Sequence, residues 1–187
     1  NNYLETGELS PEDLKAGFRK GMVAGAITPV LCGSALNHIG MTSLLDTIVQ
    51  FFPSPIDRGP ITGKKPVTGE EEIRLPEESA PFSALVFKTI ADPYAGRLTL
   101  FRVYSGTLAS VSSVFNASRK VTERIGNIFF LEGKIQKPVS LLIPGDIAAI
   151  AKLKETSTGD TLCAEKTSII YPRVEPPRAI ISFAVEP

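Results

Sequence analysis

The sequence is poor in the residues that build metal and redox sites. Its 187 residues include one histidine, two cysteines and no tryptophan. Cys32 and Cys163 lie far apart and form no CxxC pair, so we expect two reduced, buried thiols, as in a cytoplasmic protein, rather than a disulfide. Because His, Cys and Asp residues do not cluster in the sequence, we expect no metal site.

Net charge and long apolar runs are missing as well. Twenty Lys and Arg residues balance twenty Asp and Glu residues. This balance disfavours a protein that binds nucleic acid through bulk charge, although a local basic surface remains open. No apolar run approaches the length of a membrane-spanning helix, and the first residues have no signal-peptide pattern, so we expect no membrane partner.

Residues 1–54 have the pattern of a short α/β unit. Ser10 and Pro11 predict the start of a helix, because serine caps helices and proline suits the first helical position. The apolar run 27–32 predicts a buried strand, and apolar residues at helical spacing over 41–52 predict a second helix. One helix–strand–helix unit cannot form a sheet, so we expect it to be the remnant of a larger domain.

Residues 55–80 are expected to be an extended linker. The segment contains four prolines and an acidic run, and it has no hydrophobic periodicity. At most one short paired segment is expected, near residues 73–75.

From residue 81 onward, short apolar segments alternate with turn residues, which predicts a β-barrel or a β-sandwich over residues 81–175. In the segment 92–108, turn residues flank a strand with apolar residues on both faces, so this strand should be covered on both sides. The other strands are expected at 81–91, 113–116, 121–131 (with Gly126 as a bulge), 139–143, 147–153 and 161–163. A strand at 179–185 follows a proline break and should open a next domain, residues 176–187.

Three blocks of the sequence resemble translation elongation factor G, the ribosomal translocase GTPase. The first is TPVLCGSALNHIGMTSLLDTIVQFFPSP, which resembles the end of the GTP-binding domain of that family. The others are PFSALVFKTIADPYAGRLTLFRVYSGTL and PGDIAAIAKLKETSTGDTLC, which resemble its second domain, and ISFAVEP resembles the first strand of the third. The resemblance implies a mainly β fold, with a closed antiparallel β-barrel of the translation-factor second-domain type after a short α/β remnant.

The resemblance also implies a function: the chain would be the ribosome-docking part of an elongation-factor-G-like GTPase that promotes translocation of tRNA and mRNA. Release factor three and the ribosome-protection proteins share the barrel and remain alternatives. The sequence lacks the phosphate loop, DxxG and NKxD motifs, so the chain itself should neither bind GTP measurably nor hydrolyse it. GTP or GDP and Mg²⁺ are implied for the intact parent alone.

One nucleotide motif is present, the guanine-side loop of Gly33, Ser34, Ala35 and Leu36. In the family that the sequence resembles, backbone N–H groups of this loop approach the guanine O6. Small residues at the loop allow such an approach.

A local basic surface is the candidate for a partner. Residues 97–137 contain seven basic and two acidic residues. The resemblance implies that this domain docks on small-subunit rRNA and packs on other domains of the same factor. Arginine and lysine at turns suit contacts with RNA phosphates, and the candidates are Arg97, Arg119, Lys120 and Arg124. Arg102 is a candidate for RNA or interdomain contact.

Two other function classes stay open. Cys32 and His38 could act as nucleophile and base in an independent enzyme, but no orienting acid lies near them in the sequence, so a buried thiol and a surface histidine are favoured. A barrel that binds a protein or a peptide, with no ribosomal role, is the other alternative.

Overall fold

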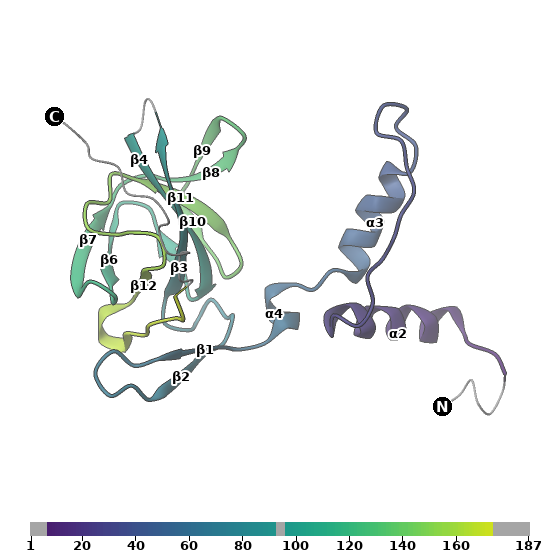
Figure 1. The fold of residues 1–187 in the computed structure, drawn as a ribbon, viewed down its shortest axis with the longest axis horizontal. Coiled ribbons are helices and arrows are strands. Elements are labelled where there is room, and N and C mark those ends of the chain that lie inside the picture. Colours follow the sequence, from purple (N-terminus) through teal and green to yellow (C-terminus); the bar gives the residue numbers. More distant parts are fainter. Residues whose placement is uncertain (1–6, 93–95, 174–187) are drawn as a thin grey trace, which may run out of the picture. The chain divides into compact units, whose positions relative to one another are not determined.

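The computed structural model describes residues 7–92 and 96–173, which fall into two compact units divided between Gly59 and Pro60. Each unit is described by itself below (Figure 1). In the part of the chain that is described, no helix is long and apolar enough to cross a membrane. The strand expected at 179–185 lies outside the described residues.

In the described part of the first unit, residues 7–59, three helices have ends that follow local sequence signals. Helix α2, Pro11–Val23, is capped by Ser10, whose side chain accepts a hydrogen bond from the Asp13 amide at 3.1 Å. Helix α3, Met41–Phe51, starts after Gly40, whose φ of 78° suits glycine. Helix α4, Pro55–Arg58, starts at Ser54 with a capping box. Both helices predicted from the sequence are confirmed.

The strand predicted at residues 27–32 is wrong. This segment has no ladder partner, and one isolated bridge between Ser34 and Ile39 follows it. A strand is stable only beside another strand, and the described part of this unit supplies none. Val30 is accordingly 88% exposed.

The first unit buries almost nothing. Neither α2 nor α3 contains a buried residue, and their main packing contact is the edge-to-face pair of Phe18 and Phe51, with ring centroids 4.9 Å apart. Arg19 donates to the Gln50 carbonyl at 2.7 Å and pairs with Asp57 at 2.9 Å. The apolar face of α3 exists as predicted, but four of its large side chains are exposed: Leu44, Leu45, Ile48 and Val49.

The second unit begins with a hairpin in the segment that we expected to be a linker. Strands β1, Ile61–Lys64, and β2, Glu71–Arg74, pair in antiparallel fashion. Lys64 and Ile170 exchange two backbone hydrogen bonds of 2.8 Å, and Arg74 donates to the Thr167 carbonyl at 2.7 Å. The hairpin therefore clasps the residues around 170. A Cβ on Gly63 would lie 2.6 Å from Ile169, so this close approach requires glycine.

An eight-stranded antiparallel sheet makes up most of the second unit, and it curls around an apolar core (Figure 1). Its strands, in spatial order, are β7 (Val121–Ile125), β6 (Ser112–Asn116), β12 (Thr161–Cys163), β3 (Ser83–Asp92), β4 (Gly96–Ser105), β11 (Ile147–Ala151), β8 (Ile128–Glu132) and β9 (Ile135–Val139). A 3-10 helix, Glu165–Thr167, follows β12. The unit is mainly β, as predicted.

The two edges of this sheet, β7 and β9, do not pair with each other within the described residues. A second, two-stranded sheet of β5 (Leu108–Ala109) and β10 (Leu141–Leu142) joins the segment before β6 to the segment after β9. The Ser110 amide also donates to the Ser140 carbonyl at 2.9 Å. The structure is thus a curled half-barrel, and full closure stays a prediction.

Strand β4 lies at the centre of the sheet between β3 and β11. Thr99, Phe101, Val103 and Ser105 are completely buried on one face, whereas Leu100, Arg102 and Tyr104 are half-buried on the other. Burial of an apolar side chain such as Phe101 stabilises the fold by about 1.5–3 kcal/mol. Coverage of this strand is therefore full on one face and partial on the other.

The strand predicted over 121–131 is two strands, β7 and β8, which lie near opposite ends of the sheet order. The two strands are separated at Gly126, where the ladder pairing is interrupted. The Gly126 carbonyl instead accepts a hydrogen bond from the Val111 amide at 3.0 Å. The strand predicted over 139–143 contains β10, Leu141–Leu142, which is shorter than expected, and β9 ends at Val139. β9 contains Pro138, which an edge strand tolerates.

Candidate nucleic-acid interface

The turn between β6 and β7 carries two of the predicted RNA contacts. Asn116 pairs with Val121, and residues 117–120 form the turn between them. The Asn116 side-chain oxygen accepts a hydrogen bond from the Arg119 amide at 3.0 Å, and Lys120 adopts a φ of 57°. This geometry leaves the side chains of both basic residues exposed.

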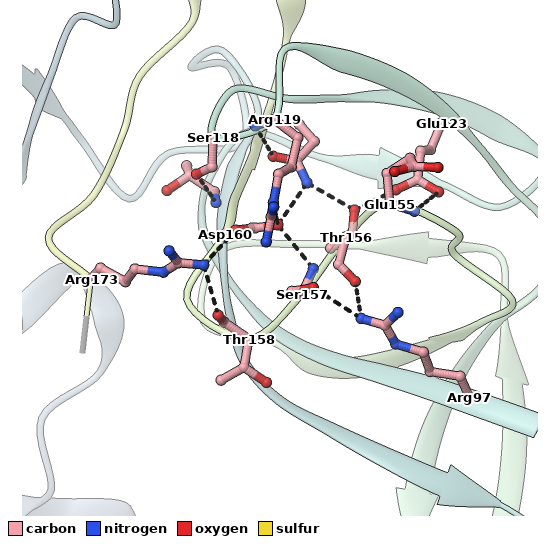
Figure 2. A network of polar contacts seen from close by, with 12 residues as sticks. Arg97, Ser118, Arg119, Glu123, Glu155, Thr156, Ser157, Thr158, Asp160 and Arg173 are labelled. Carbon is pink, nitrogen blue, oxygen red and sulfur yellow. Dashed lines mark hydrogen bonds and ion pairs between the residues drawn. The ribbon is translucent and has the colours of Figure 1, made fainter. Parts of the chain in front are cut away.

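Beneath the turn lies the carboxylate of Asp160, which is completely buried (Figure 2). Oδ2 of Asp160 accepts from Arg119 Nε at 3.2 Å, Asn116 Nδ2 at 3.1 Å and the Ser157 amide at 2.9 Å. Oδ1 accepts from Arg173 Nη2 at 3.1 Å. A buried carboxylate requires such compensation. Asp160 therefore fixes the base of the Arg119 side chain to the fold.

Residues 154–156 are held by a second buried acid, Glu123. Its carboxylate accepts from the Lys154 amide at 2.6 Å, the Glu155 amide at 3.3 Å and Thr156 Oγ1 at 2.5 Å. Thr156 Oγ1 in turn accepts from Asn116 Nδ2 at 3.0 Å. The two acids thus share one network, which orders residues 154–160.

Arg97 reaches the same network from the start of β4. Its Nη2 atom donates to the Thr156 carbonyl and, at 3.3 Å, to Ser157 Oγ. The structure therefore connects Arg97 to Arg119 through residues 156–160 (Figure 2). Both guanidinium groups have structural partners, so neither side chain is free for RNA alone.

Lys120 and Arg124 differ from these two arginines. Both are exposed, and neither forms an ion pair or a side-chain hydrogen bond with any residue that the structure describes. Arg124 lies on the edge strand β7, opposite Ser113. These are the basic side chains of the predicted set that remain available to a phosphate.

Sequence reasoning missed Asp160, Glu123 and Arg173. Glu123 was counted in the sequence as an acid that reduces the local positive charge. In the structure its carboxylate is buried and accepts backbone hydrogen bonds. The spacing of Ser157 and Asp160 is a weak local signal, since a side chain often bonds a backbone amide three residues away. Arg173 has no such signal. It packs where Gly159, with φ of 88°, leaves room, since a Cβ there would lie 2.7 Å from Arg173.

The loop Gly33–Ser34–Ala35–Leu36 belongs to the first unit. Ser34 and Ile39 exchange two backbone hydrogen bonds of 3.0 Å, and the His38 amide donates to the Ala35 carbonyl at 3.3 Å. The amides of Ala35 and Leu36 have no hydrogen-bond partner among residues 7–92 and 96–173, and both residues are exposed. The loop thus has two adjacent N–H groups that could donate hydrogen bonds to a carbonyl oxygen.

Cys32 and His38 do not form a catalytic pair in this structure. Cys32 is exposed, which corrects the expectation of a buried thiol, because no sheet covers the segment before the loop. No hydrogen bond joins Cys32 to His38 within the described residues. Those residues also contain no group of three or more His, Cys, Asp or Glu side chains that could hold a metal ion.

Residues 81–165 match the family described as Elongation factor G domain 2. These residues are similar to elongation factor G domain 2 and are called domain 2 below. Strands β3 to β12, the β6–β7 turn and all of the Asp160 network except Arg173 lie within this domain 2. The recognition made from the sequence blocks is confirmed by this match.

A crystal structure of a protein from Thermus thermophilus aligns with 94% of this chain at a TM-score of 0.68 and 24% sequence identity. At that identity, the likeness shows the fold alone. The chain spans 24% of the length of the Thermus protein. The fold of this chain is thus shared with part of the much longer Thermus protein.

Proposed function

We propose that the chain is the ribosome-docking part of an elongation-factor-G-like GTPase, and that the β6–β7 turn of domain 2 contacts phosphates of small-subunit rRNA. The observation that carries the proposal is that Lys120 and Arg124, beside Arg119, are exposed and have no partner among the described residues, on a domain similar to elongation factor G domain 2. Phosphate contacts of this kind position a protein on RNA without reading its sequence.

The Asp160 network supports this role of the turn. Asp160 accepts a hydrogen bond from Nε of Arg119 and so holds the guanidinium in place. The two Nη groups have no partner among the described residues and remain available to a ligand. A guanidinium that is held in place loses less conformational entropy when it binds. Arg97 has a supporting role, because its bonds to Thr156 and Ser157 order the loop under the turn.

The first unit is proposed to be the end of the GTP-binding domain of the parent protein. Its exposed apolar helix face suits a segment that the rest of such a domain covers. The free amides of Ala35 and Leu36 suit the guanine O6 carbonyl. The loop offers no group for phosphates or Mg²⁺, so GTP and GDP would be bound in the parent alone, and calorimetry of this chain with GDP should give no binding.

A charge-reversal experiment tests the RNA contact. The double variant Lys120→Glu/Arg124→Glu should bind isolated small ribosomal subunits more weakly, with a salt dependence reduced by about one unit of log–log slope per lost phosphate contact. The matched control is Lys15→Glu/Lys20→Glu, which makes the same charge change on exposed positions of α2. Equal loss in both doubles would mean bulk charge, and no loss in either would overturn the proposed contact.

Translocation of tRNA and mRNA in the cytoplasm is the activity that we propose for the intact parent. A toeprint assay of mRNA movement with the full-length factor distinguishes this role from that of release factor three or a ribosome-protection protein. Movement by three nucleotides that depends on GTP is expected for a translocase.

A further inference from the structure

A groove of about 240 Å³ lies on the half-buried face of β3, β4 and β11. Five side chains line it: Leu85, Phe87, Arg102, Tyr104 and Ile147. Arg102 pairs in register with Leu85 on one side and Ile147 on the other. Directly opposed residues of antiparallel strands share a face, so the guanidinium lies between two apolar side chains.

An irregularity in the sheet supplies the aromatic side chain of this groove. The β3–β4 register shifts between Val86 and Lys88, which leaves Phe87 outside the regular pairing. A bulge of this kind re-aims a side chain, and the ring of Phe87 is 42% exposed. Tyr104 is held in place by an edge-to-face contact with Tyr171 at 4.9 Å between ring centroids. The groove is therefore walled by two aromatic rings, one exposed and one fixed.

Arg102 has no counter-charge in this groove. No carboxylate of the described residues pairs with its guanidinium or accepts a hydrogen bond from it. The neighbouring acid Asp146 is committed to the Ile143 amide at 2.9 Å. A half-buried, unpaired guanidinium is poised for a carboxylate, which it can engage through two parallel hydrogen bonds.

Strand β4, which carries Arg102 and Tyr104, has strand neighbours on both sides of these residues, so a partner meets side chains here rather than a free edge of β4. Four of the five lining residues are apolar or aromatic, with one cation among them. RNA binding draws on several cations that neutralise phosphates, which this groove lacks. Its chemistry instead complements a carboxylate beside a large apolar side chain.

We propose that this groove binds a protein segment in which an Asp or Glu adjoins a leucine or an aromatic residue. The carboxylate pairs with Arg102, and the apolar side chain packs against Phe87 and Ile147. This site is independent of the proposed RNA contact, because it shares no residue with the β6–β7 turn.

The test uses the whole chain labelled with ¹⁵N and three probes. These are the peptide acetyl-Gly-Leu-Glu-Phe-Gly-amide, the same peptide with Gln in place of Glu, and a uridine hexamer. The Glu peptide should shift the amide signals of residues 85, 87, 102, 104 and 147. The Gln peptide should bind about tenfold more weakly, because it lacks the charged hydrogen bonds.

Variants locate the interaction. Arg102→Gln should remove the difference between the two peptides, and Phe87→Ala should weaken both. The control Arg58→Gln, at an exposed cation outside both proposed sites, should bind all three probes like the unmodified chain. The spectrum itself reports whether each variant is folded. Equal binding of the Gln and Glu peptides, shifts caused by the uridine hexamer alone, or no shifts with any probe would overturn the proposal.

Discussion

Nε of Arg119, whose side chain is 47% exposed, lies 3.2 Å from Oδ2 of Asp160, whose side chain is completely buried. The surface cation is thus fixed by an acid inside the domain. Because Asp160 has three other donors, the carboxylate matters more to the fold than the arginine does. The two residues should therefore respond differently to truncation.

Asp160→Ala should lower the free energy of unfolding by about 3 kcal/mol, because it removes the acceptor of the Ser157 amide and one of the two acceptors of Asn116 Nδ2. Arg119→Ala should cost about 1 kcal/mol or less, since the carboxylate keeps Arg173. Urea unfolding measures both. Glu132→Ala, which breaks an exposed pair with Lys137, is the control and should have almost no effect. A similar cost for all three would contradict this assignment.

Gly106→Ala should destabilise domain 2 by more than about 1 kcal/mol. Gly106 has a φ of 65°, and a Cβ there would lie 2.5 Å from the Ala80 carbonyl oxygen and the Phe82 amide nitrogen, both backbone atoms. Gly126→Ala is the matched control, because Gly126 has no positive φ and open space around it. Thermal unfolding compares the two variants, and equal midpoints would show that the close approach at Gly106 is absent in solution.

The two thiols should differ in reactivity. Burial raises the pKa of Cys163, so little thiolate forms there near neutral pH, whereas Cys32 is exposed. A disulfide reagent such as DTNB at pH 8 should titrate one thiol in the folded chain and two in guanidinium chloride. Cys32→Ser should abolish the fast reaction. Fast reaction of the Cys32→Ser variant in buffer would show that the strand β12 opens readily.

Amide hydrogen exchange should separate the two units. Helix α3 has no buried residue, whereas β4 lies between two strands and contains five buried residues. The amides of β4 should therefore exchange at least about a hundredfold more slowly than those of α3, because exchange from α3 needs no disruption of a core. Mass spectrometry of the exchanged chain measures this difference. Comparable protection would mean that α3 is covered in solution.

Local signals in the sequence predicted the elements that depend on local physics. Ser10 and Pro11 start α2 because a cap and a fixed φ act within one turn. The segment around β4 was predicted because Gly106 and the alternating apolar residues specify a strand without reference to its neighbours. The strand expected at 27–32 failed because strand formation needs a partner elsewhere in the chain.

The polar network shows the same limit at the candidate site. Arg119 and Lys120 were predicted together because one turn holds them. Asp160, 41 residues from Arg119, could not be connected to it by any local pattern, since strands β6 and β12 bring them together. Of the hairpin β1–β2, a paired segment near residues 73–75 was expected, but β1 was not. The hairpin's bonds to residues 167–170 could not be predicted for a related reason, since they form over about a hundred residues of chain.

The pairing of Lys64 with Ile170 gives the second unit a particular mechanical response. Because residues 64 and 170 are paired by two hydrogen bonds, the first strand of this unit and the segment that follows the 3-10 helix lie side by side. Tension applied between residues 64 and 170 loads the hydrogen bonds of the hairpin one after another. The curled sheet carries no load until the pairing of these two residues has broken. A pulling force should therefore separate these two residues before it stretches the core.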